Sequence, residues 1–252
     1  MTFWKSFLEI PSHHIFRLSI ALLLVIGFVF GLSILILPSS LVSPTLPGLP
    51  AISAREISRG NIAKKQVIFT FDGGEGNQSA EKILSTLAKH HVRGTFFLTG
   101  KFIERNPDLV RKMVSTGQEV FSHTYDHPHL TELSDQEIGE EFRKMEMTLV
   151  ATTGTSSKPY FRPPYGDRDF RVIKTAFRNG YQSIYWSVDA GDWEESEGMT
   201  DEAVRERILS NVYPGAIYLM HLGDNITGNI LDDVLSSIEK RGYKPVSLTE
   251  GL

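Results

Sequence analysis

Short apolar runs of strand length alternate with segments of helical periodicity over most of the chain. The run 66–71 (QVIFTF) is the first of these strands, and the segment 78–91 that follows places Ile83, Leu84 and Leu87 on one helical face. Alternation of this kind is typical of βα units whose strands pair in parallel. The pattern therefore predicts an α/β fold.

About seven such units fit within residues 59–252, and no internal sequence repeat is visible. This number suits a small, distorted or incomplete parallel (β/α) barrel better than an open sheet. Ser134 and Glu137 match a capping box at the start of one helix. The predicted strands are 66–71, 94–98, 119–122, 159–162, 183–188, 216–220 and 245–248, and the predicted helices are 78–91, 107–116, one beginning at Ser134, 170–179, 201–212 and 226–240.

Ionisable side chains follow five of the predicted strands directly. They are Asp72, His123, Arg162, Asp189 with Asp192, and His221. In a parallel barrel the carboxyl ends of the strands share one face, and that face carries the active site. Five matching positions therefore predict one polar pocket.

The N-terminal part carries an uncharged stretch of 20 residues, 18–37 (LSIALLLVIGFVFGLSILIL). Its length equals the ~20 residues of a membrane-spanning helix and exceeds the ~7–15 of a signal-peptide core. A cleaved signal peptide is the alternative, since small residues (Ser39, Ser40 and Ser43) follow the stretch. A buried soluble helix is disfavoured because the stretch has no polar face.

The flanking charges predict the orientation of this segment. Lys5 and Arg17 precede it, and the next basic residue is Arg55. The positive-inside rule then leaves the N-terminus in the cytoplasm and the rest outside. The expected organisation is a cytoplasmic stub with a transmembrane signal-anchor (1–37), a Pro/Ser-rich linker (38–58) and one domain (59–252).

Composition excludes several classes of protein. A net charge of −4 gives no indication of a nucleic-acid partner. Because the sequence contains no cysteine, disulfides, thiolate metal sites and cysteine nucleophiles are excluded.

Two histidines four residues apart, His123 and His127, are the strongest indication of a metal site. Imidazole is a common ligand of zinc and neighbouring first-row metals. Pro128 disfavours a helix here, so the pair is expected on a loop. The alternative is a pair of histidines satisfied by backbone hydrogen bonds. If the pair binds a metal, the chain is expected to be a hydrolase that activates water.

Five short motifs occur in order: TFDGG (70–74), HTYDH (123–127), RPPYG (162–166), DAGDW (189–193) and LMH (219–221). Together they resemble the motifs of the polysaccharide deacetylases of carbohydrate esterase family 4, the NodB-homology domain. The resemblance extends roughly over 67–248, nearly all of the expected domain.

The resemblance implies a role for each matching residue. Asp72 corresponds to the general base, and Arg162 to the residue that keeps this carboxylate ionised and oriented. His123 and His127 correspond to ligands of a divalent metal, with zinc expected and cobalt or manganese as alternatives. The alternative for Asp72 is a cap of the following turn.

His221 corresponds to the general acid that protonates the leaving amine. Asp192 corresponds to the residue that orients this imidazole and raises its pKa, and Asp189 is the other candidate. Further implied substrate contacts are the backbone amide of Tyr165, as an oxyanion donor, and an apolar wall formed by Trp193 with Leu219 or Leu222. Core packing is the alternative for the three wall residues.

The sequence departs from the family pattern at one metal ligand. The first motif of the family carries two aspartates, of which the second binds the metal, and Gly73 occupies that second position. Three alternatives follow. Either Glu75 or Asp72 substitutes as the metal ligand, or the metal is bound weakly and the substrate completes its coordination. In the third alternative the domain binds glycan without catalysis.

The resulting hypothesis is a membrane-anchored, metal-dependent hydrolase of N-acetyl groups on an extracytoplasmic polysaccharide. Peptidoglycan is the first expected substrate, followed by another glycan that contains N-acetylglucosamine. The expected location is the plasma membrane, with a single span, or the exterior if the N-terminal segment is cleaved. A glycan-binding or assembly protein on the same fold is the competing class, and a hydrolase of O-acetyl or other amide bonds is the third.

Overall fold

The structure is a computed structural model that describes residues 53–252. The predicted transmembrane segment 18–37 and most of the predicted linker lie outside the described residues. Within 53–252, no helix is both long and apolar enough to cross a membrane. The elements are β1 (Gln66–Gly73), α2 (Ala80–Lys89), β2 (Thr95–Leu98), α3 (Gly100–Arg105), α4 (Pro107–Ser115), β3 (Glu119–Ser122), η1 (Leu130–Glu132), α5 (Asp135–Thr153), β4 (Tyr160–Phe161), η2 (Pro164–Gly166), α6 (Phe170–Arg178), β5 (Gln182–Ser183), β6 (Val188–Asp189), η3 (Asp192–Glu197), α7 (Asp201–Ser210), β7 (Ala216–His221), α8 (Ile226–Lys240), β8 (Lys244–Val246) and α9 (Leu248–Gly251).

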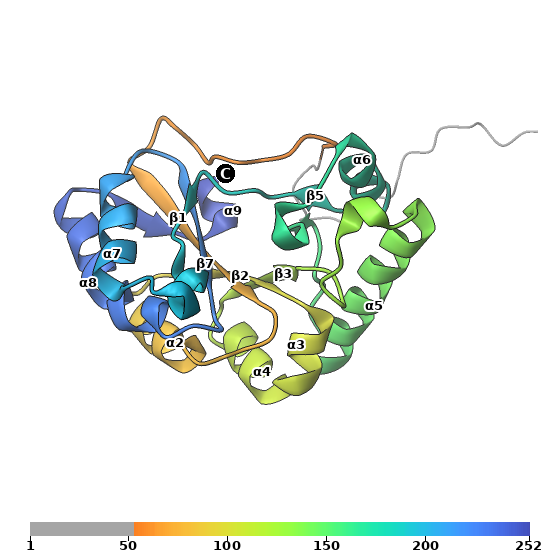
Figure 1. The fold of residues 1–252 in the computed structure, drawn as a ribbon, viewed down its shortest axis with the longest axis horizontal. Coiled ribbons are helices and arrows are strands. Elements are labelled where there is room, and N and C mark those ends of the chain that lie inside the picture. The colour runs from red at the N-terminus through yellow and green to blue at the C-terminus, as the bar shows by residue number, and fades with distance from the viewer. Residues whose placement is uncertain (1–52) are drawn as a thin grey trace, which may run out of the picture. The chain divides into compact units, whose positions relative to one another are not determined.

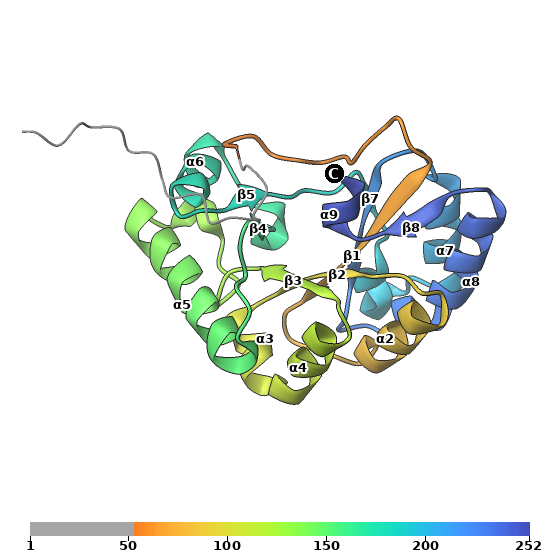
Figure 2. The ribbon, with the colours of Figure 1, turned by 180° about the vertical axis from the view of Figure 1, so that it is seen from behind.

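A curved sheet of parallel strands forms the centre of the domain. The strand order is β5-β4-β3-β2-β1-β7-β6, and β8 also pairs with β1. The helices from α7 and α8 through α2, α4 and α3 to α5 cover the outside of this sheet (Figures 1 and 2). The predicted α/β fold with an incomplete parallel barrel is confirmed.

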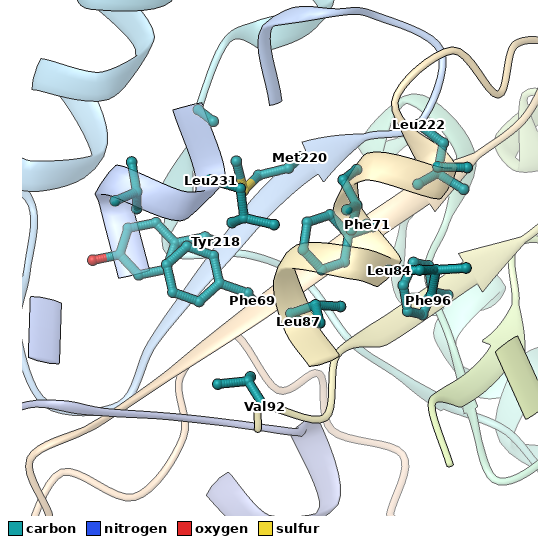
Figure 3. Packing of buried hydrophobic residues seen from close by; sticks show 14 of the residues in the cluster. Phe69, Phe71, Leu84, Leu87, Val92, Phe96, Tyr218, Met220, Leu222 and Leu231 are labelled. Atoms are coloured by element: carbon teal, nitrogen blue, oxygen red, sulfur yellow. The ribbon is translucent and has the colours of Figure 1, made fainter. Parts of the chain in front are cut away.

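Alternating residues of the central strand pack on opposite faces of the sheet. Phe69 and Phe71 lie in the large cluster between the sheet and its helices, with Phe69 stacked on Tyr218 of β7 (Figure 3). Ile68 belongs to a second cluster, formed by strand residues together with Ile184, which follows β5, and Leu248, the first residue of α9. The side chain of Asp72 therefore lies on the same inner face of the sheet as Ile68, near the carboxyl end of β1.

The predicted strand 183–188 is wrong as a single element. It is divided into β5 and β6, and a stacked Tyr185–Trp186 pair lies between them. Ile57 forms a parallel bridge with Ile184 at this break and accepts a hydrogen bond from Tyr185 N, at 2.7 Å. The end of the predicted linker therefore packs against the domain.

Other differences concern short helices. The capping box of Ser134 and Glu137 is present at the start of α5, as predicted. Helices α3 and α9 have only 6 and 4 residues and were not predicted from periodicity. Because such helices contain fewer than two turns, their apolar residues give too short a repeat for recognition.

Candidate active site

A cavity of about 930 Å³ lies at the carboxyl ends of the strands. The predicted site residues that line it are Asp72, His123, His127, Tyr165, Trp193, Leu219 and His221. The other two predicted site residues, Arg162 and Asp192, are buried behind it. The residues predicted from the ends of the strands therefore do lie together in the fold.

Asp72 and Arg162 form a buried ion pair at the base of the cavity. Arg162 Nη1 donates to Asp72 Oδ1 at 2.7 Å and to Thr70 Oγ1 at 2.8 Å. The guanidinium has no exposed surface and lies 4.3 Å from the centroid of the Phe97 ring. This contact fixes the position of the carboxylate and leaves Oδ2 as the acceptor available to the cavity.

The two motif histidines point their Nε2 atoms at each other. These atoms are 3.1 Å apart, and His123 Nε2 is 3.6 Å from Asp72 Oδ2. His123 Nδ1 donates to the backbone oxygen of Arg162 at 2.9 Å, which leaves Nε2 as a lone-pair nitrogen. Burial lowers the pKa of His123, and burial together with the charge of His123 lowers the pKa of His127 to about 3. Both rings are thus neutral at physiological pH.

Three non-glycine residues of the site adopt the left-handed backbone conformation. Thr124, His127 and Tyr165 have φ values of 66°, 61° and 58°. The Tyr165 ring contacts His127 edge-on at 4.4 Å and stacks on His129 at 4.2 Å. The left-handed conformation costs free energy for a residue other than glycine. It is retained where the surrounding structure enforces it, which is typical of functional sites.

His221 and Asp192 lie beside the ion pair at the base of the cavity, because Asp72 of β1 and His221 of β7 are aligned across the two strands. His221 Nδ1 lies 2.9 Å from Asp192 Oδ1, and Asp192 Oδ2 accepts hydrogen bonds from His221 N and Thr227 Oγ1. Although burial disfavours the imidazolium, the hydrogen bond and charge of Asp192 raise the pKa of His221 to about 9. Asp189 instead accepts from Gly191 N at 2.9 Å. Of the two candidates, Asp192 is therefore the partner of His221.

The apolar wall is only partly formed as expected. Leu219 is buried at the cavity surface, and Trp193 is 51% exposed at its rim. Leu222 is fully buried within the cluster between sheet and helices (Figure 3), so it faces away from the cavity. Among the alternatives, Leu219 is the wall residue.

The distance between the two histidine Nε2 atoms suits two ligands of one metal ion. Nitrogens bound to one tetrahedral zinc at ~2.0–2.1 Å lie about 3.3 Å apart, close to the separation seen here. Glu75 lines the same cavity, and Asp72 is the nearer carboxylate. Within residues 53–252, however, no three histidine, aspartate or glutamate side chains are grouped closely enough to form a complete site.

Apolar side chains occupy the space beside Gly73. A Cβ built on Gly73 would lie 2.6 Å from Leu98 Cδ2, 3.0 Å from Leu222 Cδ1 and 3.5 Å from Phe102 Cδ2. All three side chains are fully buried. An aspartate at this position would therefore place its carboxylate among leucines unless they moved.

Gly73→Ala is expected to lower the free energy of unfolding by about 1–3 kcal/mol, because the added methyl overpacks this contact. Gly74→Ala is the matched control, since a Cβ there meets nothing within 4 Å. It is expected to change stability by less than about 1 kcal/mol. Urea unfolding measures both, and equal effects would contradict the packing described for Gly73.

Two buried residues near His221 were missed. Thr227 bridges to Asp192, and Asp224 lines the cavity with 5% of its surface exposed. Asp224 also follows a strand end, by three residues, so the rule that identified the other acids could have found it. Thr227 lies inside α8 and carried no such signal.

Comparisons with known proteins agree with the motifs. The family model for polysaccharide deacetylase matches residues 59–184. The chain is 34% identical to the peptidoglycan-N-acetylmuramic acid deacetylase PdaA of Bacillus subtilis, over 73% of this chain and 70% of that protein. It is 32% identical to a peptidoglycan-N-acetylglucosamine deacetylase of Bacillus cereus, over 75% and 69% of the two chains.

A solved structure offers a different comparison. A protein of Bacillus anthracis described as a CE4 family pseudoenzyme matches with a TM-score of 0.75 and 33% identity, covering 79% of this chain and 69% of that one. A mutant of the same protein is described as having restored enzymatic activity, and its structure matches equally well, with a TM-score of 0.75. Similarity of fold at this level therefore includes both active and inactive proteins.

Proposed function

The chain belongs to the polysaccharide deacetylase family, and we propose that it hydrolyses N-acetyl groups on an N-acetylhexosamine polysaccharide. The observation that carries this proposal is the arrangement of two ion pairs side by side at one cavity. Asp72 with Arg162 forms one pair, and His221 with Asp192 forms the other. A site that only bound glycan would not need both a carboxylate held by a buried arginine and an imidazole held by a buried aspartate at the same cavity.

The two pairs supply the proton transfers of amide hydrolysis. Asp72 Oδ2 accepts a proton from the attacking water while Oδ1 stays bound to Arg162. His221, whose Nδ1 is held by Asp192, donates a proton from Nε2 to the leaving amine. Because its pKa is about 9, this imidazole is protonated at neutral pH, and the acid form is lost as the pH rises through that value.

The remaining residues bind and orient the substrate. In this proposal the backbone N–H of Tyr165 stabilises the tetrahedral oxyanion, and Leu219 with Trp193 borders the acetyl methyl group; all three residues line the cavity. His123 and His127 would hold a divalent metal ion, zinc in the first instance and cobalt or manganese as alternatives. Such an ion would polarise the carbonyl and lower the pKa of water.

Peptidoglycan is the substrate that we favour. The similar proteins of Bacillus subtilis and Bacillus cereus are named for N-acetylmuramic acid and for N-acetylglucosamine in peptidoglycan, respectively, so the sugar is left open between these two. Attachment to the plasma membrane through residues 18–37, with the domain outside, is part of the proposal and rests on the charges that flank this segment.

A non-catalytic glycan-binding protein is the second candidate. Two observations favour it: the apolar filling beside Gly73, and the similarity to a CE4 family pseudoenzyme. The intact base and acid pairs favour catalysis.

Acetate release distinguishes the two candidates. The full-length protein, purified in detergent, is incubated with N-acetylglucosamine oligomers and with peptidoglycan glycan strands, with added Zn²⁺, Co²⁺ or Mn²⁺ or with a chelator. The proposal expects metal-dependent release of acetate from at least one glycan. Glycan binding without release under every metal condition would identify a binding protein instead.

A further inference from the structure

Asp224 is a buried carboxyl group at the edge of the cavity that the mechanism above does not use. Its Oδ1 accepts a hydrogen bond from Thr227 N at 2.9 Å, in the manner of a cap on α8. Its Oδ2 is buried and has no hydrogen-bond partner among the described residues. Burying a carboxylate oxygen without a hydrogen bond costs folding free energy, unless the carboxyl group is protonated or interacts with another group.

The same threonine joins Asp224 to the acid pair. Thr227 is fully buried, its backbone N–H is bound to Asp224, and its hydroxyl donates to Asp192 Oδ2. Asp192 in turn holds His221 through both its oxygens. Four residues therefore form one continuous chain from the end of β7 through η3 to the first turn of α8.

We propose that Asp224 is a positioning residue for this site, a second carboxylate that acts through Thr227 and Asp192 to keep the His221 imidazole protonated. The proposal deepens the proposed function, on which it rests, by assigning the control of the general acid to two carboxylates.

The charge distribution around Asp224 agrees with this role. Burial and the negative charge of Asp192 raise the pKa of Asp224 to about 7, and its own charge contributes to the raised pKa of His221. The other titratable groups that face this region are Asp72 from β1, His123 and His127 from the loop after β3, and Glu195 from η3, whose carboxylate accepts hydrogen bonds from the backbone and side-chain amides of Asn225. In the alkaline range, where His221 loses its proton, Asp224 is ionised and favours the imidazolium.

Removal of this charge is expected to lower the pKa of His221 by about one pH unit. In Asp224→Asn the oxygen that accepts from Thr227 N is retained, so the cap on α8 is preserved. Asp224→Ser also removes the charge, and serine is a favourable capping residue, so this variant gives an independent test if the first folds poorly. Asp189→Asn is the matched control, because Asp189 lines the same cavity without a contact to His221.

The measurement is the NMR titration of ¹⁵N-histidine-labelled full-length protein, with His221 assigned from the signal lost in His221→Gln. A downward shift of about one unit in both Asp224 variants, with little change in Asp189→Asn, supports the proposal. An unchanged titration in a folded Asp224 variant would overturn it and leave only the helix cap. Because the titration needs no substrate, it decides this point even if no glycan is deacetylated.

Discussion

Asp72→Asn is expected to lower the turnover of acetate release by about 100-fold to 10,000-fold, the range contributed by a positioned general base. Asparagine keeps the size of the side chain and an oxygen that can accept from Arg162, but its amide cannot take a proton from water. Oδ2 of Asp72 is the atom concerned, since Oδ1 is bound to Arg162 at 2.7 Å. The activity should therefore fall in folded protein, and because the buried Arg162 guanidinium loses its counter-ion, this variant is also expected to be less stable than the wild type.

The measurement is kcat/KM at saturating metal, with metal content and thermal unfolding recorded for each variant. Asp108→Asn is the matched control, because Asp108 is an exposed residue of α4 that contacts only Arg111 among charged groups of the described chain. It is expected to retain the wild-type rate. Full activity in a folded, metal-loaded Asp72→Asn protein would remove Asp72 from the role of base.

The sequence predicted the site well because strand ends are easy to locate. Asp72 and His221 each terminate an apolar run, and parallel pairing then places them side by side: β1 and β7 align Asp72 with His221 directly. The alignment of these two strands can be inferred without knowing how the loops fold. It explains why residues 149 positions apart in the chain could be assigned to one pocket.

The parts that sequence could not predict depend on packing between elements. The choice of Asp192 over Asp189 follows from the turn at Gly191, which has a φ of 73° and directs the two carboxylates differently. The apolar filling beside Gly73 depends on Leu98, the last residue of β2, and on Leu222, which directly follows β7. A missing ligand was visible in the sequence, whereas the loss of space for it was not.

The division of the strand 183–188 has a similar origin. Ile57 lies more than 120 residues away in sequence and completes the sheet edge at Ile184. A local pattern cannot report that a distant segment interrupts a strand. The short helix α3 was missed for a different reason, because a helix of 6 residues has no measurable period.

Arg162→Met is expected to lower the free energy of unfolding by about 3–5 kcal/mol, because it leaves the buried Asp72 carboxylate without its counter-ion. This loss is a large share of the ~5–15 kcal/mol that stabilises a typical domain. Methionine has a similar length and fills the contact with the Phe97 ring, so the lost charge rather than a cavity dominates. Arg178→Met is the matched control; Arg178 is exposed, pairs with Asp135, and should cost at most about 1 kcal/mol.

The double variant Asp72→Asn/Arg162→Met separates the ion pair from the packing. With both charges removed, no buried charge is left unpaired, so the double variant is expected to be more stable than Arg162→Met alone. Urea unfolding of all variants at neutral pH gives the coupling energy between the two positions. A cost for Arg162→Met close to that for Arg178→Met, or purely additive effects in the double variant, would mean that the contact between Arg162 and Asp72 does not stabilise the fold.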